Sequence, residues 1–304
     1  MGCEIKDNFE LSRITTFKIG GLCDKLYLPD SIEDFEQLLR TLENPLIIAG
    51  GSNLLVSSQG VKQPVISTSK LKGLYLEGNR VVAECGVFGA FLAQTVAKSS
   101  LTGFEFLVAF PGTVGGNLYM NASAHGQFMS DCFVSARVFD LVDKSVRVLK
   151  KSDMGFAYKQ SVLQSGRYIV LDAEFTLNSR DEKEIKDLME RNLSSRKQSQ
   201  PSMAYPNAGC VFKNPENDSA GRLLDKAGMK GFEDNRVRVW DTHANFIVNK
   251  GDATSTDVLE LMLKMYNEVK ERYSIILEPE VIFVGEKNER EKEICNIIYQ
   301  KIQK

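Results

Sequence analysis

Residues 107–126 read LVAFPGTVGGNLYMNASAHG, a run in which four glycines and other small residues lie among apolar ones. The pair Pro111-Gly112 predicts a turn, since both residues interrupt regular structure. Gly115-Gly116 leaves backbone N–H groups unshielded by side chains, which is the setting in which a nest can bind an anion. Taken alone, the stretch favours a tight glycine-rich corner within a core, because glycine allows close backbone approach.

A second glycine-rich loop changes that balance. Residues 45–56 read PLIIAGGSNLLV, so an apolar strand leads into Gly-Gly-Ser-Asn and a second apolar run follows. This is not the spaced glycine fingerprint of a Rossmann domain, which needs a strand, GxGxxG and a helix in succession. Two such loops can nevertheless hold the pyrophosphate of a dinucleotide from both sides. The candidate cofactor-binding residues are therefore Gly50, Gly51, Ser52, Asn53, Leu54, Pro111, Gly112, Thr113, Gly115 and Gly116.

The two loops resemble those of the bacterial UDP-N-acetylenolpyruvoylglucosamine reductase family. Three further stretches match that family in order and spacing: TTFKIGG at 15–21, AGCVFKNP at 208–215 and LEPEV at 277–281. The resemblance spans roughly residues 10–285, and it implies an α+β fold. The expected architecture is a two-part FAD-binding module of the vanillyl-alcohol-oxidase/PCMH type followed by a C-terminal α+β substrate-binding domain. The short segment between Lys159 and Arg196 resembles the compact form, which lacks the inserted substrate-covering loop.

Composition excludes several other classes of protein. A net charge of −2 over 304 residues argues against binding to nucleic acid or to an anionic membrane. No apolar run approaches the ~18 residues of a membrane span, and the first residues lack the pattern of a signal peptide, so a cytoplasmic location is expected. The six cysteines form no CxxC pair and there are only two histidines. We therefore expect reduced thiols and no metal site.

Hydrophobic patterning predicts the elements and, with the resemblance, the domains. Helices are expected at 30–42, 88–99, 181–195, 222–227 and 254–273, with a terminal helix within 288–304. Strands are expected at 46–49, 54–57, 65–67, 74–77, 81–85, 134–141, 146–150, 168–177, 237–240, 245–249 and 275–284. Residues 196–206 read as a linker or active-site loop. The expected division is 1–70 and 71–182 for the two FAD-binding subdomains, 183–287 for the substrate domain and 288–304 for a tail without assigned function.

Three residues are candidates for catalysis. Most cysteines are small buried hydrophobes, but Cys210 lies between a turn and an apolar run, and a thiol of pKa ~8.5 is protonated at neutral pH and can donate a proton. The resembling family usually has serine here, as the donor to the substrate carbanion. Lys159 reads by itself as an exposed lysine at a strand end. The family has arginine there to hold the substrate carboxylate and stabilise the enolate, and lysine supplies the charge without the bidentate fork.

Glu280 falls within an otherwise apolar strand, where a carboxylate needs a partner or a cleft. The resemblance selects it as the active-site acid, whereas Glu278, on the same face, is interpreted as structural. Lys213 and Asn214 resemble family residues that meet the UDP-sugar or the nicotinamide nucleotide. The candidates for the remaining substrate contacts are Tyr205 and His243, for which simple packing is the alternative.

The resemblance implies a function in peptidoglycan precursor synthesis. NADPH would reduce bound FAD, which would pass hydride to UDP-N-acetylglucosamine enolpyruvate and give UDP-N-acetylmuramate after protonation by Cys210. One alternative is an FAD-linked oxidase with a different substrate cap, against which the Cys210 and Glu280 stretches argue. The other is a nucleotide-binding regulator that has lost catalysis, which the lysine at position 159 leaves open.

Overall fold

The computed structural model describes residues 2–202 and 204–300. These residues form two compact units, and the chain passes between them several times. Unit 1 contains Met1–Lys6, Lys25–Gly50 and Gln63–Arg196, and unit 2 contains Asp7–Asp24, Gly51–Lys62 and Lys197–Lys304. Each unit is described by itself below. The domain boundaries expected at residues 70, 182 and 287 stay a prediction.

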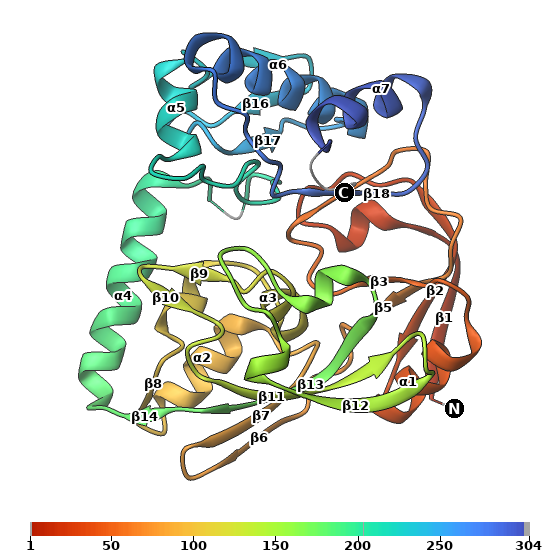
Figure 1. Cartoon of the computed structure of the whole chain (residues 1–304), viewed down its shortest axis with the longest axis vertical. Helices are drawn as coiled ribbons and strands as arrows, with labels where there is room; N and C mark the ends of the chain where they lie inside the picture. The colour runs from red at the N-terminus through yellow and green to blue at the C-terminus, as the bar shows by residue number, and fades with distance from the viewer. Residues whose placement is uncertain (1, 203, 301–304) are drawn as a thin grey trace. The chain divides into compact units, whose positions relative to one another are not determined.

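Unit 1 is built on a five-stranded antiparallel sheet with the strand order β12-β11-β13-β7-β6 (Figure 1). Its strands are β6 (Leu74–Glu77), β7 (Arg80–Glu84), β11 (Phe133–Asp140), β12 (Ser145–Lys150) and β13 (Tyr168–Thr176). The strands expected at 74–77 and 81–85 form one hairpin, and those expected at 134–141 and 146–150 form another. In the first, Glu77 pairs with Arg80, and Gly78 adopts a φ of 58°, which a two-residue hairpin loop requires at its first position.

A second sheet has the order β1-β2-β5-β3. Its strands are β1 (Cys3–Glu10), β2 (Leu22–Pro29), β3 (Leu46–Ile48) and β5 (Val65–Ser67), and both β2 and β3 pair with β5 in parallel. Helix α1 (Ile32–Thr41) follows β2. Its N-cap is Ser31, whose side chain accepts a hydrogen bond from the Asp34 N–H at 3.1 Å, as the capping signal predicts.

The helices of unit 1 bury the inner residues of the five-stranded sheet. Helix α2 spans Gly89–Ala97, and α3 (Val114–Tyr119) packs against β7 and β13. Phe104 and Phe175 meet edge-to-face in this core, with ring centroids 5.1 Å apart. The remaining short elements of the chain are the pairs β8 (Leu101–Thr102) with β14 (Asn178–Ser179) and β9 (Ser123–Ala124) with β10 (Gln127–Phe128), and 3-10 helices at Leu11–Ile14, Glu105–Ala109, Lys151–Asp153 and Val162–Ser165.

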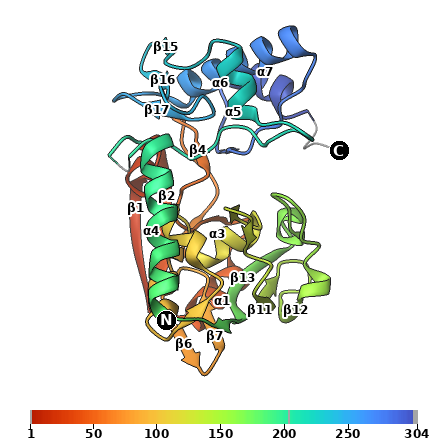
Figure 2. The same ribbon diagram turned by 90° about the vertical axis from the view of Figure 1, so that its left-hand side faces the viewer.

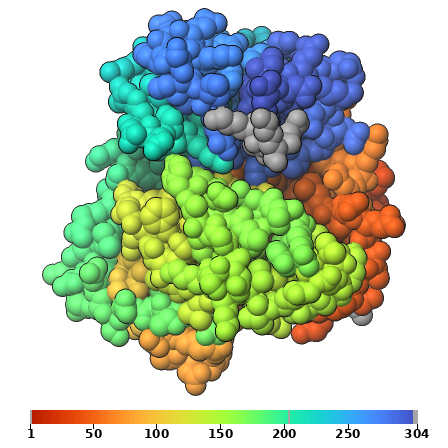
Figure 3. Space-filling view, in the orientation of Figure 1, coloured from red at the N-terminus to blue at the C-terminus, as the bar shows by residue number. Residues whose placement is uncertain are grey.

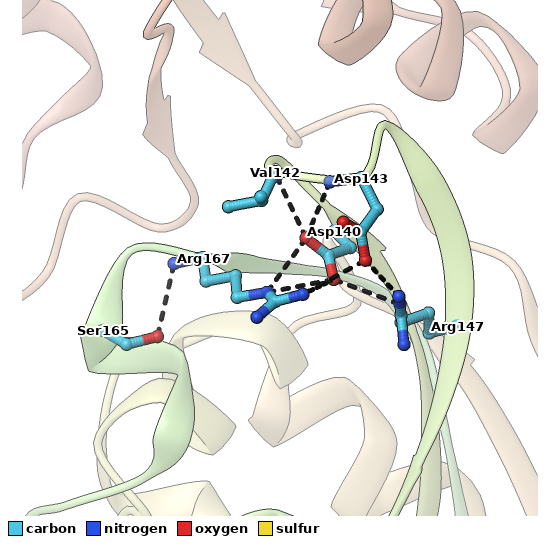
Figure 4. A network of polar contacts seen from close by, with 6 residues as sticks. All are labelled: Asp140, Val142, Asp143, Arg147, Ser165 and Arg167. Atoms are coloured by element: carbon cyan, nitrogen blue, oxygen red, sulfur yellow. Dashed lines mark hydrogen bonds and ion pairs between the residues drawn. The ribbon is translucent and has the colours of Figure 1, made fainter.

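The β11–β12 hairpin is fixed at its tip by an enclosed carboxylate (Figure 4). Asp140 has a fully buried side chain and binds Arg167 at 2.7 Å and Arg147 at 3.1 Å. The Arg167 guanidinium holds the pKa of Asp140 well below its usual range. The hairpin lies in the lime-green segment that faces the viewer in Figure 3, and its outer strand leaves Val148 60% exposed. The ion pairs therefore hold β12, a strand that packs little of its surface against apolar residues.

Unit 2 combines helices with two small sheets. The strands β15 (Glu233–Asp234), β16 (Val237–Val239) and β17 (Ile247–Asn249) form one sheet, and β4 (Leu54–Val56) pairs in parallel with β18 (Ile282–Val284). The helices are α5 (Ala220–Lys226), α6 (Ser255–Tyr273) and α7 (Glu289–Ile298). The helix expected at 254–273 is confirmed as α6, and the residues that it buries lie at helical spacing: Val258, Leu261, Met262, Met265 and Val269.

Several of the expected elements differ from the structure in their bounds, partners or buried residues. Strand β4 lies within the strand expected at 54–57, and its partner is β18, which is distant in sequence. The helix expected at 181–195 is α4 (Glu182–Ser199), an unbroken helix in Figures 1 and 2 that takes in part of the expected linker. Within α4, Leu193 is 36% exposed and Asn192 is buried in its place.

The strand expected at 275–284 is reduced to β18, because Pro279 cannot donate a ladder hydrogen bond and forms a single bridge with Phe212. In the terminal helix, Ile294 and Ile298 are buried, as expected, but Ile297 is exposed. Ile302 lies outside the described residues. No helix within residues 2–202 and 204–300 has the length and apolar character to span a bilayer.

Candidate active site

Three of the five stretches that carry the family resemblance lie in unit 2, and the stretch 45–56 passes from unit 1 into unit 2 after Gly50. Thr16, in the stretch 15–21, binds both the second glycine loop and the residue that precedes the stretch 208–215. Its N–H donates to the Gly51 carbonyl at 3.1 Å, and its hydroxyl donates to the Asn207 carbonyl at 2.7 Å. Gly51 has a φ of 60°, and a Cβ there would lie 2.3 Å from the Ile14 carbonyl oxygen. Only glycine fits this position, and the protein's own packing is the reason.

The backbone of Glu280 is held from two sides. Its N–H donates to the Val211 carbonyl at 2.8 Å, and its carbonyl accepts from the Asn53 side-chain amide at 3.0 Å. The Ile282 N–H returns a bond to the Asn53 carbonyl at 3.0 Å. The sequence suggested Asn53 as a cofactor ligand, and the structure shows that its side chain binds the Glu280 backbone. The second glycine loop and the candidate acid therefore form one bonded assembly.

Cys210 lies at the start of a short extended segment that pairs with Phe246. The turn before it is an Asx turn, in which the Gly209 N–H donates to the Asn207 side chain at 3.0 Å and Gly209 adopts a φ of 78°. Cys210 itself is partly exposed, and no disulfide joins any of the six cysteines of the described residues. A half-buried thiol on a braced turn is a chemically competent proton donor.

Asn245 braces this segment, and sequence reasoning missed it. Its carbonyl accepts from the Val211 N–H at 2.9 Å. Its side-chain amide accepts from the Phe212 N–H at 3.0 Å and donates to the Phe212 carbonyl at 2.7 Å. Asn245 is 2% exposed, and its side-chain amide satisfies the backbone N–H and carbonyl of Phe212 as a neighbouring strand would. A polar amide just ahead of the apolar run at 246–248 is the only signal that the sequence offers.

Lys213 and Glu278 form an ion pair, with Nζ and Oε1 2.6 Å apart. Their side chains are 22% and 37% exposed, so water screens the pair and its contribution to stability is small. Leu277 and Val281 are buried while Glu278 and Glu280 are partly exposed, which confirms that the two carboxylates share a face. Asn214 is exposed, and its side-chain oxygen accepts from the Ala220 N–H at 3.0 Å.

Tyr205 and His243 occupy different settings. Tyr205 is 49% exposed and packs against Trp240, with ring centroids 4.8 Å apart. His243 packs edge-to-face on Phe246, and its Nδ1 accepts from the Asn245 N–H at 3.3 Å. Burial lowers the pKa of His243, which favours the neutral imidazole.

The first glycine loop lies in unit 1, where the protein itself uses most of its polar groups. The Gly112 carbonyl accepts from Gly89 at 2.8 Å and the Gly115 N–H donates to Cys85 at 2.9 Å. Thr113 caps α3 by accepting from the Gly116 N–H at 3.5 Å. The glycine-rich stretch thus contains a capped helix that was not predicted from the sequence.

The three glycines of this loop differ in what surrounds them. A Cβ on Gly112 would lie 2.3 Å from the Asn117 side-chain oxygen, and one on Gly115 would lie 3.0 Å from the Cys85 Cβ. A Cβ on Gly116 would meet nothing closer than the Thr113 hydroxyl at 3.7 Å. The protein's own packing therefore does not require glycine at position 116, where a Cβ would make only ordinary contacts.

Lys159, also in unit 1, lies in a tight turn. Ala157 and Gln160 exchange backbone hydrogen bonds of 3.2 Å across it, and Lys159 adopts a φ of 55°. The Asn121 amide donates to the Ala157 carbonyl at 3.0 Å, and the Gln164 amide donates to the Lys159 carbonyl at 3.0 Å. Two side-chain amides thus hold the backbone of this turn, whereas the sequence alone suggests a lysine at a strand end.

Comparison with known proteins supplies the decisive observation. The family model described as UDP-N-acetylenolpyruvoylglucosamine reductase, C-terminal domain, matches residues 200–284, and the FAD binding domain model matches residues 24–148. A UDP-N-acetylenolpyruvoylglucosamine reductase of Caldanaerobacter subterraneus is 39% identical, over 92% of this chain and 93% of the relative. The chain belongs to the UDP-N-acetylenolpyruvoylglucosamine reductase family. A relative of that name from Clostridium novyi is 38% identical, over 94% of each chain.

A solved structure of a reductase of this family, from Thermus caldophilus, agrees with the fold. Its TM-score is 0.80 at 33% identity, over 93% of this chain and 99% of that one. The expected α+β class, with an FAD-binding part and a C-terminal reductase domain, is confirmed. The matched C-terminal domain contains both the Cys210 and the Glu280 stretch.

Proposed function

We propose that this chain reduces UDP-N-acetylglucosamine enolpyruvate to UDP-N-acetylmuramate, with FAD as the bound carrier and NADPH as the hydride donor. Membership of the reductase family over more than nine-tenths of the chain supports this proposal. The observation that carries it is the bonded assembly of Asn53, Val211 and Glu280, which ties the second glycine loop to the Cys210 segment.

The residues present fit FAD. Thr113 and Gly116 would contact a phosphate at the start of α3, where backbone N–H groups favour an anion and the protein's own packing does not require glycine at 116. The loop from Gly50 to Leu54 is the second candidate contact. When bound, FAD supplies two-electron chemistry, accepting hydride from NADPH and returning it to the substrate.

The chain's own residues supply the proton and the charge. Reduction of the enolpyruvyl double bond adds hydride at C3 and a proton at C2. Cys210 would donate that proton from its thiol and be reprotonated from solvent. Glu280 would assist the transfer, and Lys159 would hold the substrate carboxylate, whose charge grows as the carbanion forms.

The nucleotide part of the substrate would meet the rim of unit 2. Lys213 would contact it with the donors that Glu278 does not use, and Asn214 is exposed for the same purpose. Tyr205 and His243 are proposed as further substrate contacts, and His243 also packs on Phe246. The oxidase alternative is not favoured, because the family match includes the C-terminal domain.

The test begins with the purified chain. Denaturation should release FAD, and NADPH oxidation should be stimulated by UDP-N-acetylglucosamine enolpyruvate with formation of UDP-N-acetylmuramate. In deuterated water, mass spectrometry should find deuterium at C2 of the product. Oxidation that needs only oxygen would support the oxidase alternative. FAD binding without turnover would support the regulator.

A further inference from the structure

Helix α7 lies beyond the matched C-terminal domain, which ends at residue 284, and its sequence predicts no role. The structure shows that unit 2 holds the start of this helix tightly. Glu291 has no exposed surface, and its carboxylate accepts from the Ser255 hydroxyl at 2.5 Å and the Thr256 hydroxyl at 3.1 Å. Ser255 and Ser58 bind each other through their N–H groups and hydroxyls at 2.9 Å.

The middle of α7 packs along α6, and the two helices lie side by side in Figure 1. Ile294, Cys295 and Ile298 are buried on the inner face. On the outer face, Arg290 reaches Glu260 of α6 at 2.6 Å. The helix is therefore fixed before its last turn, which sets where the residue after it can reach.

That residue is Tyr299, and its hydroxyl donates to the Val281 carbonyl at 2.9 Å. Burial raises the pKa of Tyr299, so the phenol keeps the proton that this bond needs. Val281 directly follows Glu280 and is itself buried. Tyr299 thus binds the backbone of the residue next to the candidate acid.

With Tyr299 included, hydrogen bonds hold the backbone of both Glu280 and Val281. The Glu280 N–H is bound by Val211 and its carbonyl by Asn53, at 2.8 and 3.0 Å. The next N–H, of Val281, has only a long bond of 3.4 Å to the Val211 carbonyl. Tyr299 supplies the bond to the following carbonyl, and so limits rotation of the backbone that carries the carboxylate.

We propose that Tyr299 is a positioning residue, which acts through Val281 to hold Glu280 in the orientation that protonation of the substrate needs. The effect on catalysis in this inference rests on the proposed function. The tether itself does not, because it concerns bonds within the chain.

The test uses the FAD-loaded full chain and Tyr299→Phe, which removes the hydroxyl and keeps the ring. Hydrogen–deuterium exchange of the peptide containing residues 280–282 should become about fivefold faster, the factor for one hydrogen bond of ordinary net strength. In anaerobic stopped flow, flavin reduction by NADPH should be unchanged. Flavin reoxidation by the enolpyruvyl sugar should slow by a similar factor.

Glu291→Gln is the matched control, because it weakens the docking of the same helix at the opposite end. This variant should lower Tm, and it should not slow flavin reoxidation selectively over flavin reduction. Unchanged exchange at 280–282 in Tyr299→Phe would overturn the tether. Two other results would overturn the positioning role. In the first, exchange is faster in Tyr299→Phe but flavin reduction and flavin reoxidation slow equally. In the second, Glu291→Gln also slows reoxidation while leaving reduction unchanged. If the wild-type protein shows no sugar-dependent reoxidation, the proposed function fails, and exchange alone then decides the tether.

Discussion

Replacement of Gly116 by alanine tests whether this glycine is needed for FAD binding or for packing within the protein. Gly116 lies within α3 and its φ is not positive, so alanine fits the backbone. The new methyl would lie 3.7 Å from the Thr113 hydroxyl and 4.0 Å from the Ala49 Cβ, both ordinary contacts. Alanine also favours a helix over glycine by roughly 0.5–1 kcal/mol, so the apoprotein should be equally stable or slightly more stable.

FAD binding should respond in the opposite direction. A phosphate packed against the start of α3 would be displaced by the methyl group of Gly116→Ala. The loss of one charged hydrogen bond, roughly 1.5–3 kcal/mol, corresponds to about a 10- to 150-fold weaker Kd. Titration of apoprotein with FAD, followed by quenching of flavin fluorescence, measures this value. Thermal unfolding of the same apoprotein gives its stability.

Gly112→Ala is the control for that experiment. Its methyl would lie 2.3 Å from the Asn117 side-chain oxygen, so this variant should destabilise the apoprotein itself. An unchanged Kd for FAD in Gly116→Ala, with a stable apoprotein, would refute the assignment of this loop to the cofactor.

Three further predictions follow from single side chains. Asn245→Ala leaves the buried N–H and C=O of Phe212 without partners, so urea denaturation should show a loss of about 2–6 kcal/mol. Arg167 lowers the pKa of Asp140, so the stabilisation from this carboxylate is present above its unfolded pKa of ~3.9 and is lost as pH falls through the folded value. Asp140→Asn should accordingly have a lower Tm than the wild type near neutral pH, and this difference should disappear in strong acid. Lys159→Met should slow flavin reoxidation by the enolpyruvyl sugar roughly 100-fold, the scale of one lost electrostatic contact to the transition state, while Lys159→Arg retains most of the rate.

Elements with strong local patterns could be predicted from the sequence. The stripe of α6 repeats at helical spacing, and Thr254 forms the capping box that begins it. The β11–β12 hairpin follows from two apolar runs around Asp143-Lys144. In these segments the residues that decide the structure are near neighbours, so periodicity carries the information.

Other elements depend on partners that are distant in sequence. Strand β1 is mostly exposed and charged, so it lacks the alternation by which strands are recognised. Helix α3 contains Gly115-Gly116, and capping by Thr113 with packing against β7 and β13 overrides their low helix propensity. Strand β4 pairs with β18 more than two hundred residues away, and no local pattern predicts that pairing.

The candidate site shows the same limit. The motif stretches identified Cys210, Lys213 and Glu280, because the family resemblance extends across each of them. Asn245 and Tyr299 were missed, since each acts through a hydrogen bond to a remote backbone group. Backbone recognition of this kind leaves no compositional signal in either partner.

The most direct measurement of the central claim is single-turnover kinetics of Cys210→Ala. Under anaerobic conditions NADPH should reduce the bound flavin at nearly the wild-type rate. Reoxidation by UDP-N-acetylglucosamine enolpyruvate should slow by about 10²–10⁴-fold, the usual effect of removing a positioned general acid, and Cys210→Ser should retain more activity than the alanine variant. Equal slowing of both half-reactions would make Cys210 a packing residue. Unchanged reoxidation in Cys210→Ala would contradict the account, because another group would then deliver the proton.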